Sequence, residues 1–146
     1  MATRSRIAME MADGTVKSIY CHWDGYPSNN GRLLLENYDD HAKVEKLIAL
    51  GDISYLAKEV DPDPDEDHTF GNPQEGVTVA YHRDRGEDLR KPILHKSVPD
   101  FVKSDVEEYG YIFTQEGEWL VVNGHASSMD REAIQIGYVL SGTVKL

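Results

Sequence analysis

Residues 20–27, "YCHWDGYP", combine an imidazole, a carboxylate and three large aromatic rings within one short stretch. Aromatic faces with one or two polar anchors are typical of sites that stack on a base or another planar ligand. The candidate ligand-binding residues of this first cluster are Tyr20, His22, Trp23, Asp24 and Tyr26. The structural alternative stays open: Trp23, Tyr26 and Pro27 would close the end of a hydrophobic core, and Asp24 would cap a turn.

A second cluster, "AYHRDRGED" at residues 80–88, places alternating charges at the end of a predicted strand. Arginines two residues apart point to the same side of a strand, and paired guanidinium groups suit a phosphate or a carboxylate. The candidate ligand-binding residues here are Tyr81, His82, Arg83 and Arg85. In the alternative interpretation the arginines only pair with their acidic neighbours at a solvated strand end.

Both clusters also contain side chains that could support hydrolysis. His22, Asp24, His82 and Asp84 are enough ligands to hold a metal ion that activates water. Their spacing matches no common metal signature, and the sequence lacks H-E-x-x-H, G-x-S-x-G and both glycine-rich phosphate loops. We therefore favour binding without a cofactor, and a small metal-dependent hydrolase or nuclease is the alternative.

The first cluster follows a predicted β-hairpin over residues 4–23. Its turn is Asp13-Gly14, a pair that readily adopts the positive φ angles of a two-residue type I′ turn. Such a turn sets Glu10 opposite Lys17. The predicted register gives one face to Ile7, Met9, Met11, Val16, Tyr20 and His22, and the other face to Ile19, Cys21 and Trp23.

Two further segments are predicted to be β-structure. "YGYIFTQEGEWLVV", residues 109–122, predicts a second hairpin around Glu116-Gly117, with Tyr111 and Phe113 opposite Val122 and Leu120. "VTVAYHRD", residues 77–84, predicts a single central strand that carries the second cluster.

Helices are predicted between these strands. Residues 31–38 and 41–50 predict two helices, the second capped by Asp39 or Asp40 and stopped by Gly51. Ser97 opens another over 97–108, and further helical turns are predicted in 52–60 and after Asp130. The fold class is therefore α+β: an antiparallel sheet of about five strands, built from two hairpins and a central strand, with helices packed on one face.

Residues 61–76 interrupt this pattern. They hold three prolines, two glycines and six acidic side chains, which predicts an exposed, weakly ordered acidic loop. A divalent-cation loop is the alternative, although the spacing does not fit an EF-hand.

The length of 146 residues fits a single domain, 1–146, and the formal net charge is -11. That charge repels nucleic-acid backbones and anionic membranes, so we expect neither as a partner. No apolar run reaches the length of a membrane span or a signal core, which predicts a cytoplasmic protein. The single Cys21 excludes an intramolecular disulfide; it is either a small buried residue or a catalytic thiol. Self-pairing into a homodimer is one way to protect the sheet edges.

Several segments carry a resemblance: "RSRIAMEMADGTVKSIYCHWDGYP", then "GRLLLENY", and later "AYHRDRGED". In these segments the chain resembles a group of small proteins encoded by tailed bacteriophages, including phages of cyanobacteria. "HWDGYP" and "HRDRGED" are the shared marks, and the hairpin "YIFTQEGEWLVV" is similar too. The resemblance implies a protein made in the infected bacterial cell that acts on host metabolism or defence. It implies no particular activity.

These observations together predict a phage accessory protein of the host cytoplasm that binds or sequesters a partner. For a nucleotide-like signal, Trp23 and Tyr26 would stack on the base while Arg83 and Arg85 contact phosphate. For a host protein, including a defence protein, the acidic surface would mimic nucleic acid. Convergence of the clusters is a hypothesis, in which His22 and Arg83 share one cavity.

Overall fold

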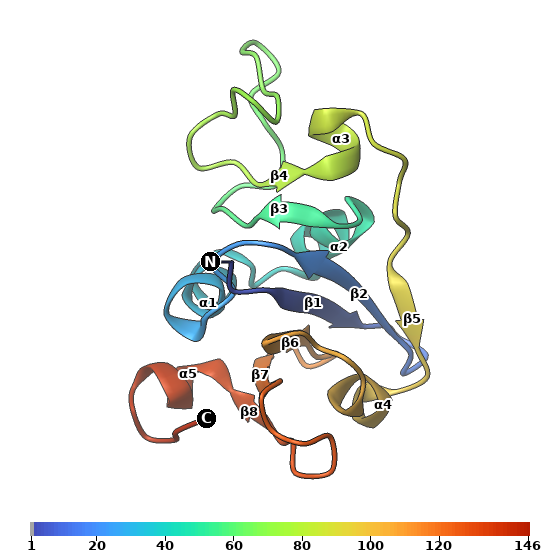
Figure 1. Cartoon of the computed structure of the whole chain (residues 1–146), viewed down its shortest axis with the longest axis vertical. Coiled ribbons are helices and arrows are strands. Elements are labelled where there is room, and N and C mark those ends of the chain that lie inside the picture. Colours follow the sequence, from blue (N-terminus) through green and yellow to red (C-terminus); the bar gives the residue numbers. More distant parts are fainter. Residues whose placement is uncertain (1) are drawn as a thin grey trace.

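The computed structural model describes residues 2–146, which form eight strands and five α-helices (Figure 1). The strands are β1 (Ser5–Glu10), β2 (Val16–Cys21), β3 (Ile53–Tyr55), β4 (Val79–Ala80), β5 (Ile93–His95), β6 (Tyr109–Phe113), β7 (Trp119–Asn123) and β8 (Ala133–Gln135). The helices are α1 (Arg32–Asn37), which follows a π-helical turn over Pro27–Gly31, α2 (His41–Ala49), α3 (Tyr81–Arg85), α4 (Val98–Lys103) and α5 (Ile136–Leu140).

One mixed sheet in the order β4-β3-β2-β1-β6-β7-β8 joins the strands, and β5 also pairs with β2. The two predicted hairpins exist as β1–β2 and β6–β7. They are joined by a parallel pair, β1 with β6, and β2 also pairs in parallel with β3. The α+β class is confirmed. The prediction of an antiparallel sheet of about five strands gave too few strands and missed the parallel pairs.

The first hairpin is shifted by one residue from the predicted register. Glu10 lies opposite Val16, and Lys17 lies opposite Met9 rather than Glu10. The cause is a three-residue loop ending at Gly14, whose φ of 87° is typical of a type I turn followed by a G1 bulge. A slip of one residue exchanges the faces of a strand, so Val16 and Tyr20 lie on the face opposite Ile7 and Met9.

The same correction applies to the second hairpin. Phe113 lies opposite Trp119 and Tyr111 opposite Val121, one residue from the predicted partners. Here too the loop has three residues, and its last residue, Gly117, has a φ of 82°.

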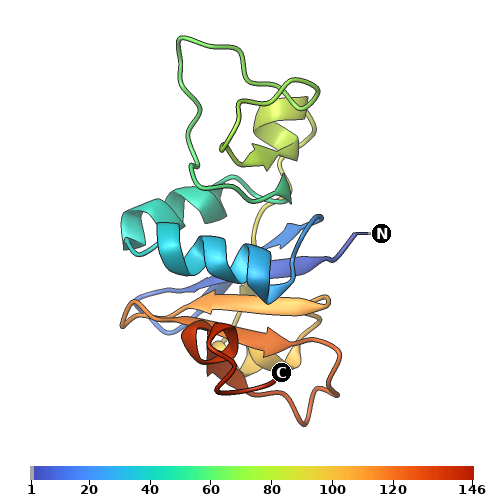
Figure 2. The same cartoon turned by 90° about the vertical axis from the view of Figure 1, so that its left-hand side faces the viewer.

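Helices cover both faces of the sheet, not the single face predicted. Figure 2 shows α1 and α2 in front of the strands, where Leu34 and Leu47 join a core with Ile7 and Ile19. On the opposite face Phe101 of α4 packs with Ala8, Val16, Ile112 and Val122. Alternating residues of the central strands are therefore buried on both sides.

Helix starts and stops with a local signal match the prediction. The Asp40 carboxylate accepts a hydrogen bond from Ala42 N at 3.0 Å, and the Ser97 hydroxyl accepts one from Asp100 N at 3.2 Å. Gly51 follows α2 with a φ of 73°.

Four segments were predicted wrongly where such signals are absent. The helix predicted over 97–108 ends at Lys103, so residues 104–108 are not helical. Residues 52–60, predicted as helical, contain β3, and the segment after Asp130 begins with β8 before α5. Residues 77–84, predicted as one strand, change after β4 into α3, so Tyr81 to Arg85 are helical. The Asp84 carboxylate accepts a hydrogen bond from Ala80 N at 2.8 Å, a cap that ends the strand there.

Most residues of the 61–76 loop are exposed, and the loop is fixed at several points. The Gln74 side chain accepts a hydrogen bond from Asp63 N and donates to the carbonyls of Asp63 and Glu66. Phe70 N donates to the carbonyl of Asp84 at 2.9 Å. Within residues 2–146, no helix has the length and apolar character needed to cross a membrane.

Candidate functional site

The two sequence clusters meet through Asp52, the residue just before β3. Its carboxylate accepts a hydrogen bond from Tyr20 N at 3.0 Å, and its main-chain carbonyl accepts one from Tyr81 N at 3.3 Å. The strand β3 lies between β2 and β4. The end of β2 and the start of α3 therefore lie at the same end of these three strands. Sequence reasoning missed Asp52, whose only signal was an acidic residue after the helix stop at Gly51.

A cavity of about 240 Å³ opens at this junction. We call it the tyrosine–arginine cavity; it is lined by Tyr20, Asp52, Tyr81, Arg85, Glu87 and Arg90. Burial raises the pKa of both tyrosines above 10, so their hydroxyls stay protonated at neutral pH and can donate hydrogen bonds. The cavity therefore combines two rings and two guanidinium groups with two carboxylates.

Phe70 of the acidic loop supports the wall of this cavity. Its ring stacks on Tyr81 with centroids 5.7 Å apart and planes 30° apart, and the Arg85 guanidinium lies 4.7 Å from its centroid. Arg85 also forms a 3.4 Å ion pair with Glu87. Contacts of both kinds hold side chains in place, so Phe70 links the acidic loop to the cavity.

Arg83 does not share the cavity with Arg85. In a helix, residues two apart lie about 200° apart around the axis, so the strand-based clamp is not formed. Arg83 instead donates to the carbonyls of Val60 and Thr78, each at 2.7 Å, and forms a 2.8 Å ion pair with Asp84. These bonds tie α3 to the segments on either side of the acidic loop.

Asp84 is likewise committed to structure, since its side chain is only 2% exposed. Burial opposes ionisation, but hydrogen bonds from Arg83 and Ala80 N and the positive charge of Arg83 outweigh it. The pKa of Asp84 is therefore lowered. The buried His68 Nε2 lies 3.2 Å from Asp84, and its Nδ1 accepts a hydrogen bond from Gln74 N. The two side chains fasten the loop to α3.

The remaining residues of the first cluster lie beyond the end of β2. His22 Nδ1 is hydrogen-bonded to the Tyr20 hydroxyl at 2.7 Å, and its ring meets Trp23 edge-on at 4.8 Å. Asp24 has a φ of 56° in the turn that follows, and Tyr26 precedes the π-helical turn. Trp23 and Tyr26 are 43% and 41% exposed, so neither closes the core.

The four residues of the metal-hydrolase alternative are not gathered at one point. His82 is hydrogen-bonded through Nδ1 to the Glu87 carbonyl, Asp84 to Arg83 and His68, and His22 to Tyr20. Across residues 2–146, no three or more His, Cys, Asp or Glu side chains form a group that could hold a metal ion.

Cys21, the last residue of β2, is fully buried. Burial raises the pKa of its thiol to about 11, and the Asn30 amide lies 3.4 Å from its sulfur. At neutral pH the thiol is therefore protonated and packed, which is the state of a structural cysteine.

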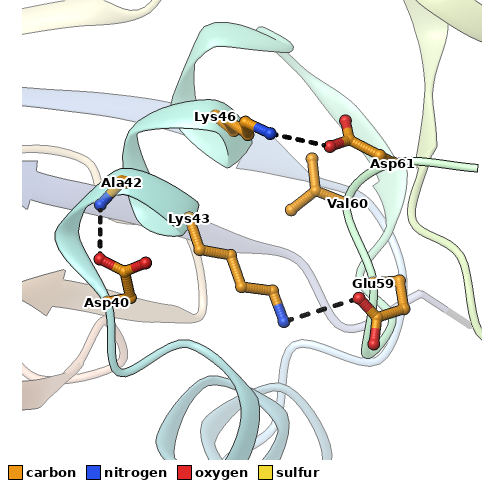
Figure 3. Close-up of a pocket in the computed structure, with 7 residues that line it drawn as sticks. All are labelled: Asp40, Ala42, Lys43, Lys46, Glu59, Val60 and Asp61. Atoms are coloured by element: carbon orange, nitrogen blue, oxygen red, sulfur yellow. Dashed lines mark hydrogen bonds and ion pairs between the residues drawn. The ribbon is translucent and has the colours of Figure 1, made fainter.

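A second cavity, also of about 240 Å³, lies between α2 and residues 59–61 (Figure 3). Lys46 Nζ lies 3.1 Å from Asp61, and Lys43 Nζ lies 4.0 Å from Glu59 while it donates to the Asn37 carbonyl. An anion would have to displace these carboxylates. In the tyrosine–arginine cavity Arg85 is likewise paired with Glu87, but Arg90 takes part in no ion pair with any of residues 2–146.

No family model matches this chain, and comparisons with curated proteins and with solved structures give no match.

Of the nine predicted ligand-binding residues, the structure brings three into the tyrosine–arginine cavity: Tyr20, Tyr81 and Arg85. His22 contacts the cavity indirectly through Tyr20. Glu87 belongs to the "HRDRGED" element but was not among the predicted ligand-binding residues. Arg90 lies three residues after Glu87. Arg90 had no signal beyond its positive charge.

Proposed function

We propose that the tyrosine–arginine cavity binds a small nucleotide-like anion, and that the protein sequesters this ligand as a phage accessory protein in the infected bacterial cell. One observation supports this above all others: two separate sequence clusters and Arg90 line one cavity. The resemblance to bacteriophage proteins supplies the cellular setting.

Each part of such a ligand has a complementary group in the cavity. Arg85 and Arg90 suit the phosphate, since guanidinium groups form charge-assisted and often bidentate hydrogen bonds with it. The partly buried rings of Tyr20 and Tyr81 offer faces or edges to a base. The carboxylates of Asp52 and Glu87 can accept hydrogen bonds from exocyclic amines or ribose hydroxyls.

The charge of the cavity narrows the ligand class further. Two guanidinium groups face two carboxylates, so the lining is formally neutral. A ligand with one phosphate is then better matched than a triphosphate, whose additional charge would meet Asp52 and Glu87. We expect nucleoside monophosphates and cyclic nucleotides to bind more tightly than nucleoside triphosphates.

Isothermal titration calorimetry with AMP, GMP, cyclic AMP and ATP tests this function. Arg90→Ala removes one charge-assisted contact, which is typically worth about 1.5–3 kcal/mol, and should weaken binding about 10- to 100-fold. Arg32→Ala is the matched control, because Arg32 is an exposed arginine of α1 paired only with Glu36 at 3.7 Å.

Two results would overturn the proposal. One is no heat and no thermal stabilisation with any nucleotide at millimolar concentration. The other is equal affinity for the wild type and Arg90→Ala. Turnover of a bound nucleotide that requires a divalent cation would instead favour the hydrolase alternative.

A further inference from the structure

The strand β5 is an edge strand with one side unpaired. Ile93, Leu94 and His95 lie opposite Ser18, Lys17 and Val16 of β2, and the other side of β5 pairs with no strand of residues 2–146. Figure 1 shows β5 at the right-hand margin of the molecule, outside β2. Main-chain groups on that side remain open to a further strand.

Large aliphatic side chains are exposed along this edge. In β5, Leu94 is 65% exposed and Ile93 51%, and Leu89, which precedes the strand, is 42% exposed. No other strand of the sheet has an exposed large hydrophobic side chain. His95 is directed inward: its Nε2 lies 2.8 Å from the Ser18 hydroxyl, and its ring packs against Phe101 of α4. The exposed apolar side chains therefore lie on a strand that the contacts of His95 with β2 and α4 hold in place.

The edge is also basic on an acidic protein. Residues 89–96, "LRKPILHK", contain Arg90, Lys91 and Lys96 and no acidic side chain, whereas the whole chain has a net charge of -11. All three basic residues are exposed. Charge complementarity at such a strip selects an acidic partner.

An apolar cavity continues the strip toward α2. It has a volume of about 210 Å³ and is lined by Pro92, the residue before β5, by Lys17, which lies opposite Leu94, and by Glu45 of α2. Met9, Met11 and Ile48 supply its apolar surface. Methionine side chains adapt to differently shaped apolar groups, which suits a surface that receives a side chain from a partner.

A second copy of this chain is a poor occupant of the edge. Antiparallel pairing of two β5 strands about Leu94 would bring Lys96 of each copy opposite Pro92 and close to Lys91 of the other. The acidic loop of another copy is unsuitable as well, because Pro62 and Pro64 cannot donate ladder hydrogen bonds.

We propose that the free edge of β5 binds an extended acidic peptide of another protein, which adds to the sheet as a strand. Main-chain hydrogen bonds to β5 would hold the peptide, apolar side chains of the peptide would cover Ile93 and Leu94, and flanking acidic residues would pair with Lys91 and Lys96. This inference does not rest on nucleotide binding.

The test uses fluorescence anisotropy with two labelled peptides, Glu-Glu-Val-Ile-Val-Glu-Glu and its counterpart with lysine in place of glutamate. We expect saturable binding of the acidic peptide only, weakened by added salt. The double variant Lys91→Glu/Lys96→Glu should lower its affinity about tenfold or more, and Leu94→Glu should do the same. Both variants change only exposed side chains, and Lys58→Glu is the matched control that should leave affinity unchanged.

Hydrogen exchange provides the second measurement. Binding of the acidic peptide should slow exchange of the main-chain amide of Leu94, which points to the free side, whereas the amides of Ile93 and His95 face Ser18 and Val16 of β2 and should change less. The proposal is overturned if the lysine peptide binds equally well, if neither peptide saturates at 1 mM, or if the charge reversals leave the affinity unchanged. It is also overturned if sedimentation shows a dimer that Leu94→Glu dissociates, since the edge would then serve a second copy.

Discussion

Asp52 accepts a hydrogen bond from the main-chain N–H of Tyr20, with Oδ1 and N 3.0 Å apart. Tyr20 lies in β2, and Asp52 lies 32 residues further along the chain, directly before β3. The same residue accepts Tyr81 N through its carbonyl, so it aligns both aromatic walls of the tyrosine–arginine cavity. Neither sequence cluster contains the residue on which their convergence depends.

Asp52→Ala should destabilise the protein by about 1–3 kcal/mol, because it leaves the partly buried Tyr20 N–H without its acceptor. Urea unfolding followed by far-UV circular dichroism measures this change. Asp39→Ala is the control, as Asp39 is exposed between α1 and α2. Equal stability of the two variants would show that the hydrogen bond contributes little.

Gly51→Ala should be more damaging than an ordinary loop substitution. Gly51 has a φ of 73°, and a Cβ atom there would lie 2.5 Å from the main-chain oxygen of Arg90. We expect a loss of about 1–3 kcal/mol in the free energy of unfolding and weaker nucleotide binding, since the backbone at Arg90 must shift. Gly71→Ala, where a Cβ meets no atom within 4 Å, should change neither quantity.

Phe70→Ala should weaken nucleotide binding a few-fold with little change in melting temperature. The ring contacts both Tyr81 and Arg85, so its removal loosens two cavity residues while the core is untouched. Calorimetric titration of Phe70→Ala against Tyr138→Ala, which removes an exposed aromatic ring on α5, separates a local from a general effect. A large fall in melting temperature would indicate a purely structural role.

His95 should make stability depend on pH. Burial, and then the positive charge of Arg6, lower the pKa of His95 below 6.5, while Asp100 opposes this. The unfolded chain therefore binds more protons than the folded protein between the lowered pKa and 6.5. The contribution of the neutral histidine is present above pH 6.5 and is lost as the pH falls through that window.

Thermal unfolding at several pH values between 5 and 8 tests this expectation. His95→Gln can keep a hydrogen bond to Ser18 but does not titrate, so its melting temperature should fall less than that of the wild type on acidification. Parallel curves for the two proteins would mean that other groups cause the pH dependence.

Much of the local structure could be predicted from the sequence because it depends on neighbouring residues. The glycines after Asp13 and Glu116 require chain reversals, and Asp40 and Ser97 accept hydrogen bonds from N–H groups two or three residues ahead. Such interactions are present before the chain is compact. They identified both hairpins and the start of α2 and α4.

Only the tertiary structure decided how these pieces fit together. Two turn lengths were compatible with the same glycines, and packing of Ile7 with Ile19 and Tyr111 selected the three-residue loops and hence the faces of the strands. The parallel pairing of β1 with β6, and the placement of Asp52 between Tyr20 and Tyr81, join residues far apart in the chain. No local preference encodes such contacts, because they are stabilised only when the whole sheet and both of its helical layers are assembled.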